Sequence, residues 1–309
     1  MKFKKILVTG FDRSNLNENI WTRIQKSTDK IVFKPSSPQT DVDCLFSKFN
    51  KIDKKFIDSL PLLKYIGLLA TGFGTVDIAY AKSKKITVCN IPGYATESVA
   101  EFVFGLILEH IRDLEKAKQV ARQGDFSGNG FSAYEIKEKQ FGIIGLGRIG
   151  RRVAEIALGF GAKVSYWSKN RKKEMEKKGI KYEPIDKLIP KCDFLSLHLS
   201  KTKETEEILN KKRMNSVLKG AIVINMAPME LVDLSALEER LKEGDMTFIF
   251  DHPDEMDKKD IEKLVEYRNC IVYPPIGFVT DEATALKKEI FISNLENFLK
   301  GKPTNQVNL

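Results

Sequence analysis

The feature that most constrains this chain is a glycine-rich turn that joins an apolar run to a helical pattern and is followed by a second apolar run. The first run is Phe141–Ile144, the turn is GLGRIG at 145–150, and the second run is Lys163–Trp167. A turn of this kind needs glycines for a tight reversal, for close approach of the backbone to a pyrophosphate, and for close packing of helix on strand. The strand–turn–helix–strand order therefore predicts a dinucleotide-binding unit.

The residues of the turn have separate expected roles. We expect Gly145 to form the tight turn, Gly147 to face the pyrophosphate and Gly150 to face the strand. The helix is expected to begin near Arg148, where free N–H groups and the helix dipole favour phosphates. Arg148 and Ile149 complete the predicted pyrophosphate site.

The end of the second apolar run indicates which dinucleotide binds. An NAD site has an acidic residue there, which accepts hydrogen bonds from the ribose hydroxyls. This chain has no acid in the stretch from Trp167 to Arg171. Ser168 can hydrogen-bond a 2′-phosphate, and Lys169 and Arg171 can neutralise it. We therefore predict NADP (NADPH) in preference to NAD, with ordinary surface charges as the alternative interpretation.

The rest of the chain alternates apolar runs with charged stretches of helical pattern, which predicts parallel sheets. The apolar runs are KKILVTG, DCLFSKF, LKYIGLLAT, ITVCNIP, QFGIIGLG, KVSYWS, DFLSLHLS, AIVINMA, MTFIFDH and NCIVYPP. One long helix is expected from Ser98 to Gly124 and another from Asp281 to Lys300. The predicted fold class is α/β, with two doubly wound parallel-sheet domains that are Rossmann-like or flavodoxin-like.

Composition narrows the class of protein. The chain has 309 residues, of which 42% are hydrophobic and 30% charged, as expected of a globular protein with one or two domains. The net charge of +9 comes mainly from scattered lysines without interleaved aromatics, so no nucleic acid partner is expected. No apolar run approaches the roughly 18 residues of a membrane span, so no membrane partner is expected. Four cysteines without paired spacing indicate no metal site, no disulfide framework and a cytoplasmic location.

Several stretches together resemble the D-isomer-specific 2-hydroxyacid dehydrogenase family over nearly the whole chain. GLGRIG is similar to its nucleotide turn, and ATGFGTVDIAYAKSKKITVCNIPGYATESVAE resembles its substrate-domain signature. INMAPMELVDLSALEERLKEG is similar to its catalytic-arginine segment. CDFLSLHLSKTKETEEILN and TDEATALKKEIFISNLENFLKGKPTNQVN resemble the segment after its fourth cofactor-domain strand and its C-terminal helix. The SKNR stretch is similar to NADP-using glyoxylate/hydroxypyruvate reductases.

The resemblance implies a division into two domains. Residues 1–97 plus 281–309 would form the substrate domain, and residues 98–280 the NAD(P)-binding Rossmann domain. The active site would lie in a cleft between them, and a homodimer would form through the cofactor domain. Thr205 matches a family position near the nicotinamide ribose, and Asp251 matches the aspartate that holds the carboxamide.

The resemblance also implies three catalytic side chains, and this chain departs from the family at all three positions. In the family an arginine grips the substrate, a histidine supplies the proton and a glutamate holds the histidine. The corresponding positions here are Pro228, Pro275 and Met256. A slippage of one residue would place Glu255 at the glutamate position. Because proline has neither a titratable group nor a donor, we expect the usual acid–base machinery to be absent.

Other side chains could substitute for the missing acid. His252 follows Asp251 directly and could lie near the cleft, although an ordinary loop histidine is an equal alternative. His198 matches a histidine of the family's Leu-His segment and is expected to be structural, while His110 lies on the long helix at a packed or surface position. Three residues of the hinge-side loop could also supply a proton, without any feature that singles one out: Tyr94, Thr96 and Glu97.

The residues around the expected nicotinamide end are apolar. Met229 replaces a family glycine, and Phe278 occupies a position where the family has a small residue. If the fold holds, the side chains that converge there are those of Pro228, Met229, Met256, Pro275 and Phe278. This pattern fits either a pocket for a less polar substrate or a site that is closing after loss of activity.

Three functions therefore stay open. The leading hypothesis is an NADP(H)-binding oxidoreductase that lacks ordinary 2-hydroxyacid dehydrogenase activity and, if catalytic, transfers hydride to or from a substrate that needs little proton chemistry. The second is a non-catalytic NADP(H) sensor or scaffold. The third is a hydroxyacid dehydrogenase or glyoxylate reductase that uses substitute residues such as His252 and Glu255.

Overall fold

The computed structural model describes residues 2–33 and 40–309, which divide into two compact units with one parallel sheet each. Unit 1 is Met1–Tyr94 with Thr280–Leu309, and unit 2 is Ala95–Val279. The predicted fold class, two α/β units with parallel sheets, is confirmed. The roles assigned to the two predicted domains stay predictions.

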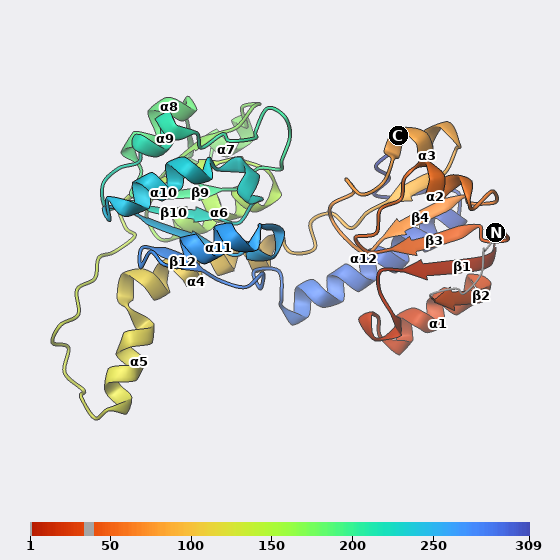
Figure 1. Cartoon of the computed structure of the whole chain (residues 1–309), viewed down its shortest axis with the longest axis horizontal. Helices are drawn as coiled ribbons and strands as arrows, with labels where there is room; N and C mark the ends of the chain where they lie inside the picture. The colour runs from red at the N-terminus through yellow and green to blue at the C-terminus, as the bar shows by residue number, and fades with distance from the viewer. Residues whose placement is uncertain (1, 34–39) are drawn as a thin grey trace. The chain divides into compact units, whose positions relative to one another are not determined.

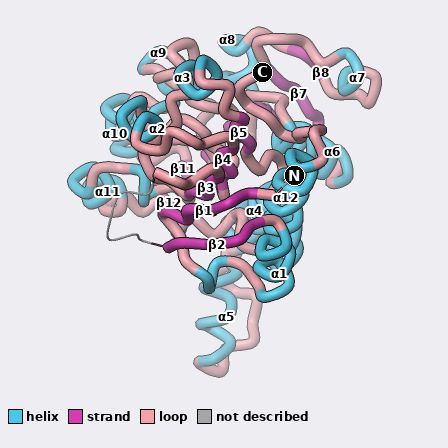
Figure 2. The backbone as a smooth tube through the Cα atoms, turned by 90° about the vertical axis from the view of Figure 1, so that its right-hand side faces the viewer, coloured by secondary structure: helices cyan, strands magenta, loops and turns pink. Residues whose placement is uncertain are grey.

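The sheet of unit 1 has the strand order β2-β1-β3-β4-β5, which can be followed in Figure 2. Its strands are β1 (Phe3–Thr9), β2 (Thr28–Phe33), β3 (Cys44–Ser47), β4 (Tyr65–Leu68) and β5 (Thr87–Cys89). All pairs are parallel. The chain first adds a strand on one side of β1 and then continues on the other, as in flavodoxin-like sheets. The switch point therefore lies between β1 and β3.

Helices cover both faces of this sheet (Figure 1). They are α1 (Glu18–Lys26), α2 (Lys54–Asp58), α3 (Ile78–Ser83) and α12 (Asp281–Leu299), with a short 3-10 turn η1 (Arg13–Asn15). Strand side chains alternate between faces. On one face Ile6 and Phe46 pack with Trp21 of α1 and Phe291 of α12. On the other, Leu45 packs with the residues of α2 and α3.

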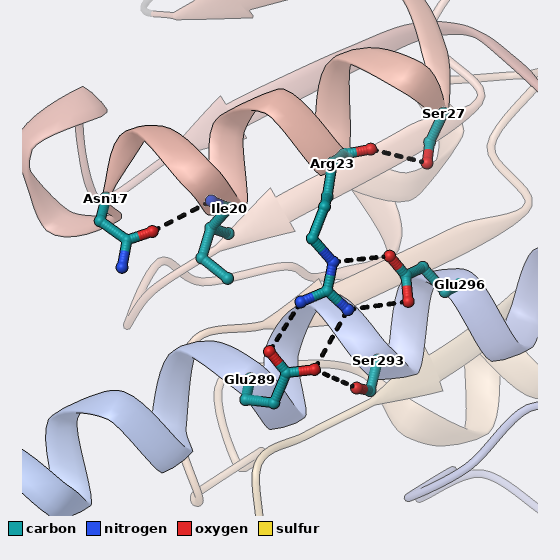
Figure 3. Close-up of polar contacts among 7 residues, drawn as sticks. All are labelled: Asn17, Ile20, Arg23, Ser27, Glu289, Ser293 and Glu296. Atoms are coloured by element: carbon teal, nitrogen blue, oxygen red, sulfur yellow. Dashed lines mark hydrogen bonds and ion pairs between the residues drawn. The ribbon is translucent and has the colours of Figure 1, made fainter.

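An arginine holds α1 to α12 within unit 1 (Figure 3). The Arg23 guanidinium donates to Glu296 Oε1 and Oε2 at 2.8 and 2.9 Å. It also donates to Glu289 Oε2 and Oε1 at 2.6 and 3.1 Å. Ser293 adds a hydrogen bond to Glu289 at 3.0 Å. This paired contact joins the first helix of the chain to the last one.

The sheet of unit 2 has seven parallel strands in the order β12-β11-β10-β9-β6-β7-β8. They are β6 (Gln140–Ile144), β7 (Lys163–Trp167), β8 (Lys181–Tyr182), β9 (Phe194–Leu197), β10 (Ile222–Asn225), β11 (Thr247–Phe250) and β12 (Cys270–Val272). The chain starts at β6, proceeds to one edge, and then resumes at β9 on the other side of β6. This is the Rossmann order, with its switch point between β6 and β9.

The helices of unit 2 also lie on two faces. They are α4 (Thr96–Arg112), α5 (Leu114–Arg122), α6 (Arg148–Gly159), α7 (Lys173–Glu176), α8 (Ile185–Leu188), α9 (Lys211–Asn215), α10 (Leu234–Lys242) and α11 (Lys258–Leu264). The 3-10 turns are η2 (Ile189–Lys191), η3 (Met229–Leu231) and η4 (Pro253–Glu255). Phe141 of β6 stacks on Phe104 of α4. Ile144, on the opposite face of the same strand, packs with residues of α8, α9 and α10.

Each apolar run of the sequence contains or begins a strand, whereas two strands and one helix break were not predicted. The strand β2 is an edge strand of mixed polarity, and β8 has only two residues. The single long helix expected from Ser98 is wrong: α4 ends at Arg112, and Asp113 has a φ of +48° before α5 begins. Aspartate tolerates this left-handed conformation better than most residues do, which allows the turn.

We predict that Arg23→Met destabilises unit 1 by about 1–3 kcal/mol at pH 7, less than for a fully buried pair because Glu289 is half exposed. The change leaves two carboxylates on α12 without their cation. Urea unfolding would be followed by the fluorescence of buried Trp21, in a Trp167→Phe background so that unit 1 alone is observed. Arg13→Met, which removes an exposed pair with Glu18, is the matched control and should leave the midpoint unchanged.

The effect of Arg23→Met should depend on pH in one direction. Hydrogen bonds from Arg23 lower the pKa of both Glu289 and Glu296. A carboxyl with a lowered folded-state pKa stabilises the fold above its unfolded pKa of about 4.3, and this contribution is lost as pH falls through the folded-state value. The difference between wild type and variant should therefore shrink below pH 4. A difference that stayed constant down to pH 2 would contradict the ion-pair account.

Candidate functional site

The backbone of the turn between β6 and α6 packs so closely that two of its three glycines leave no room for a side chain. Gly145 has a φ of +100°, and a Cβ there would lie 2.6 Å from the carbonyl oxygen of His198. A Cβ on Gly150 would lie 2.0 Å from the carbonyl oxygen of Gly145. A Cβ on Gly147 would meet nothing within 4 Å, so open space lies beside this residue. The tight turn at Gly145 and the close packing at Gly150 agree with expectation, while the role of Gly147 toward a pyrophosphate stays a prediction.

Backbone hydrogen bonds fix this turn to the neighbouring strands. The N–H of Gly145 donates to the carbonyl of Trp167, and the N–H of His198 donates to the carbonyl of Ile144, both at 2.8 Å. The start of α6 therefore lies at the switch point between β6 and β9, where ligands bind in sheets of this kind. Its first N–H groups have no intrahelical partner, so they can receive an anion.

A hollow of about 570 Å³, here called the turn hollow, opens at this point. Its lining residues are Gly145, Leu146, Gly147, Arg148, Arg151, Ser168, Lys169, Asn170, Lys172, His198, Leu199 and Ser200. Five of these were predicted cofactor residues: Gly145, Gly147, Arg148, Ser168 and Lys169. Arg151 and Lys172 add two cations that the sequence analysis missed. Helical spacing from Arg148 could have identified Arg151, which lies one turn further along α6.

The three residues predicted to bind a 2′-phosphate do not all lie together in the structure. Ser168 is buried and donates to the carbonyl of Asn170 at 2.7 Å. Lys169 lies on the turn hollow and contacts Glu204 at 2.5 Å. Arg171 instead contacts Glu176 at 2.5 Å and lies 5.0 Å from the centre of the Tyr182 ring. Arg171 is therefore not brought to the hollow, and Lys172 occupies its expected place.

The remaining predicted cofactor residues lie outside the turn hollow. Ile149 and Gly150 continue α6. Thr205 caps the loop after β9, where its hydroxyl donates to the carbonyl of Ser200 at 2.8 Å and accepts from the N–H of Thr202. Their part in cofactor binding stays a prediction.

Asp251 is a buried carboxylate at the end of β11. Its Oδ2 accepts from the N–H of Gly277 at 3.4 Å, while its Oδ1 makes no hydrogen bond among the described residues. The ring of His252 lies beside it, with Nε2 3.4 Å from Oδ1. Burial raises the pKa of Asp251, and the charge of His252 opposes that shift. A buried acceptor without a hydrogen bond fits a ligand that brings an N–H donor.

Of the five side chains predicted to form an apolar pocket, only two border the same hollow. Met229 is buried in the core of unit 2, and Asn225 Nδ2 lies 3.2 Å from its sulfur. Met256 packs on the same core, and both methionines border a hollow of about 400 Å³. Pro228, Pro275 and Phe278 do not line that hollow. The expectation that all five side chains meet is therefore not supported within unit 2.

This second hollow, here called the acidic hollow, carries seven carboxylates. They are Glu206, Glu207, Glu230, Asp233, Glu255, Asp257 and Asp260. Glu255, one of the two substitute candidates, borders it, whereas His252 does not. Sequence reasoning missed the hollow because its acids come from three separate loops.

The other candidate acids have structural partners. His198 Nε2 lies 2.8 Å from Ser196 Oγ, and burial lowers the pKa of His198 to about 3, so the ring is neutral. His110 Nε2 lies 3.2 Å from Thr247 Oγ1. Glu97 accepts from Arg152 at 2.6 Å. Tyr94 is partly buried in unit 1, and burial raises its pKa.

Within residues 2–33 and 40–309, no group of three or more His, Cys, Asp or Glu side chains could hold a metal ion. In the same ranges, none of the helices has both the length and the apolar character that crossing a bilayer requires.

Comparison with known proteins identifies the family. Residues 104–277 match the family described as D-isomer specific 2-hydroxyacid dehydrogenase, NAD binding domain. The chain is 35% identical to a glyoxylate reductase of Thermococcus litoralis over 278 residues, which cover 87% of this chain and 84% of the relative. It is 31% identical to a hydroxypyruvate reductase of Blautia hydrogenotrophica over 275 residues, with 87% and 85% covered.

Solved structures agree with this result. A D-lactate dehydrogenase of Aquifex aeolicus, complexed with NAD and lactic acid, has a TM-score of 0.83, 26% identity and 96% coverage of both chains. An acyclic imino acid reductase in complex with NADPH and D-Arg has a TM-score of 0.83 and 27% identity, covering 98% of this chain and 99% of that one. This chain therefore belongs to the D-isomer-specific 2-hydroxyacid dehydrogenase family of NAD(P)-dependent enzymes.

Proposed function

We propose that this protein binds NADP(H) and transfers hydride to or from a substrate that needs no proton donor at the moment of transfer, such as a conjugated or iminium acceptor. The observation that carries the proposal is the set of residues that follow β10, β11 and β12. The family positions of the arginine, glutamate and histidine hold Pro228, Met256 and Pro275. None of these side chains can clamp an anion or release a proton.

The cofactor assignment is supported by the turn hollow. Four cations border it, namely Arg148, Arg151, Lys169 and Lys172, and no carboxylate is among its described lining residues. Two of the four are paired with carboxylates, Arg151 with Glu174 at 2.8 Å and Lys169 with Glu204 at 2.5 Å. The open space beside Gly147 and the free N–H groups of α6 suit a pyrophosphate. When bound, the nicotinamide supplies or accepts the hydride. Asp251 would accept a hydrogen bond from its carboxamide through Oδ1, which lies 3.4 Å from His252 Nε2 but makes no hydrogen bond among the described residues.

An iminium acceptor suits a site without an acid. Hydride addition to a ketone leaves an alkoxide, which must be stabilised and protonated. Hydride addition to an iminium carbon cancels an existing positive charge and leaves a neutral amine. The carboxylates of the acidic hollow favour a cationic ligand over an anionic one. The solved imino acid reductase shows that a protein of similar fold binds NADPH.

A second candidate function is reduction of a keto acid with His252 as the proton donor. The contact that favours it is the 3.4 Å approach of His252 Nε2 to Asp251 Oδ1, which would orient the ring. Relatives named glyoxylate reductase also favour it. Glu255 is exposed at the rim of the acidic hollow, and its N–H donates to the carbonyl of His252 at 3.4 Å. Among the described residues the His252 ring lies near Asp251 and Asp254 instead of the Glu255 carboxylate, so these two side chains do not form a pair of the family's kind.

We also infer a homodimer that forms through α5, and a cytoplasmic setting. The helix α5 has no buried residue, and Figure 1 shows it extending away from the sheet of unit 2. Leu114 and Val120 of α5 line a hollow of about 460 Å³ together with Phe126, which is 85% exposed. A second copy is the occupant that the family resemblance implies. Four buried, unpaired cysteines support a reducing compartment.

The first prediction concerns the cofactor. Calorimetric titration should show NADPH binding about 10–100-fold more tightly than NADH, because one or two charge-assisted contacts reach the 2′-phosphate. Lys169→Gln should weaken NADPH binding about tenfold and leave NADH binding unchanged. Arg171→Gln is the matched control, since Glu176 holds that side chain away from the turn hollow. Equal losses for both cofactors in Lys169→Gln would contradict the NADP preference.

The second prediction concerns the substrate. With NADPH, oxidation monitored at the nicotinamide absorbance should be faster by tenfold or more, as an order of magnitude, for cyclic or acyclic imines than for glyoxylate or hydroxypyruvate. His252→Ala should not change the imine rate. Robust glyoxylate reduction that His252→Ala abolishes would instead establish the keto-acid function. Tight NADPH binding without turnover across carbonyls and imines would indicate a cofactor sensor.

The third prediction concerns assembly. Val120→Asp places a charge on the apolar side of α5 and should convert a dimer into a monomer of 35.1 kDa, measured by light scattering after gel filtration. Gln119→Asp, on the exposed side of the same helix, should remain dimeric. A wild-type protein that is monomeric at micromolar concentration would refute the inference.

A further inference from the structure

A buried tyrosine of unit 2 ties the loop after β7 to the short helix that follows it. Tyr166 lies in β7 with no exposed surface, and its hydroxyl can donate one hydrogen bond and accept others. It accepts from the N–H of Lys172, the residue before α7, at 2.6 Å, and it donates to Glu176 Oε1 at 2.9 Å. Burial raises the pKa of Tyr166, so the hydroxyl keeps the proton that it donates.

The carboxylate of Glu176 also holds Arg171 away from the turn hollow. The guanidinium of Arg171 donates from Nε and Nη2 to Glu176 Oε1 and Oε2, at 3.0 and 2.5 Å. Its carbon lies 5.0 Å from the centre of the Tyr182 ring, which packs edge-on against Tyr166. Hydrogen bonds from Arg171 lower the pKa of Glu176, so the pair stays ionised at neutral pH. A pair with two parallel hydrogen bonds fixes the direction of the guanidinium.

Lys172 is the cation of this loop that the fold leaves open to a ligand. Lys169 and Lys172 both border the turn hollow, and Ser168 borders it between β7 and the loop. Lys169 already contacts Glu204 at 2.5 Å. Across the part of the chain that the structure describes, the Lys172 ammonium makes no ion pair with a carboxylate. A phosphate group that binds Lys172 therefore displaces no carboxylate of the protein.

We propose that Lys172 selects NADP(H) by binding the 2′-phosphate, and that Tyr166 is the positioning residue that fixes the backbone from which Lys172 reaches the turn hollow. The proposal deepens the proposed function and rests on its cofactor. A lysine side chain is flexible, so a fixed backbone reduces the entropy that is lost when its ammonium meets a phosphate. Without the Tyr166 hydroxyl the N–H of Lys172 loses its partner, whereas the ring still fills the core.

The test uses two probes that differ in the 2′-phosphate alone, 2′,5′-ADP and 5′-AMP. Calorimetric titration of the full chain measures the affinity for each. We expect Lys172→Gln to weaken 2′,5′-ADP binding about tenfold and to leave 5′-AMP binding unchanged, because one charge-assisted contact is lost. Lys172→Arg should retain most of the affinity. Arg171→Gln removes the same charge one residue away and should change neither probe, since Glu176 holds that side chain.

Tyr166→Phe distinguishes positioning from packing, because it keeps the buried ring and removes the hydroxyl. Binding of 2′,5′-ADP should weaken several-fold, and binding of 5′-AMP should not. In a Lys172→Gln background the same change should add nothing, because Tyr166 acts through Lys172. Tyr182→Phe keeps the ring beside Arg171 and is the control, with no change expected for either probe. Equal weakening of both probes, or an undiminished effect in the Lys172→Gln background, would overturn the positioning role.

Failure of this inference and failure of the proposed function give different results. Lys172 is partly exposed, and its substitution keeps the backbone N–H that Tyr166 accepts, so Lys172→Gln decides the proposal even where Tyr166→Phe does not fold. Equal affinities of the wild type for the two probes would overturn the NADP preference and this inference with it. A wild type that prefers 2′,5′-ADP, with Lys172→Gln indistinguishable from it, would overturn this inference alone.

Discussion

The site in unit 2 depends on one close backbone approach, that of α6 to the end of β6. The helix lies so near the strand that a Cβ at Gly150 would be 2.0 Å from the Gly145 carbonyl. This approach directs the first N–H groups of α6 toward the switch point and leaves open space beside Gly147. A methyl group at Gly150 would push the helix outward and move every group that it carries. The cations Arg148 and Arg151 reach the turn hollow because the helix starts at this place.

Charge is divided along the carboxyl-terminal edge of the unit 2 sheet. Cations border the turn hollow beside β6 and β7, and carboxylates border the acidic hollow beside β10 and β11. This division occurs within a chain whose net charge is +9. In NADP the pyrophosphate joins the two nucleosides and the 2′-phosphate lies on the adenosine ribose, so we propose that this field favours binding with the adenosine end on the β7 side. We propose that the carboxylates of the acidic hollow favour a positively charged reactant over an anionic one.

Strands were predictable from sequence because burial on both faces requires continuous apolar runs, and such runs marked ten of the twelve strands. The other two lack that pattern: β2 is an edge strand of mixed polarity and β8 is an edge strand of only two residues, whereas the edge strands β5 and β12 do carry apolar runs. The glycine roles were predictable because backbone sterics act locally. Side-chain direction was not: Arg171 turns to Glu176 five residues away, and Met229 turns into the core. The acidic hollow could not be predicted from the sequence either, because its residues are distant in the chain and come together only in the folded sheet.

The environment of Asp251 supports the proposal that this chain binds a cofactor although the family's acid–base positions hold other residues. A buried carboxylate oxygen without a donor costs about 1–3 kcal/mol, and a hydrophobic residue in its place would avoid that cost. Such an arrangement is advantageous when a ligand supplies the missing N–H. After β10 and β12 the corresponding positions hold Pro228 and Pro275, whose side chains have no polar group that would need a hydrogen bond. The proposal of hydride transfer without acid catalysis accounts for this combination, with an acceptor that lacks a hydrogen bond where a carboxamide would bind and no polar side chain where a keto acid would be protonated.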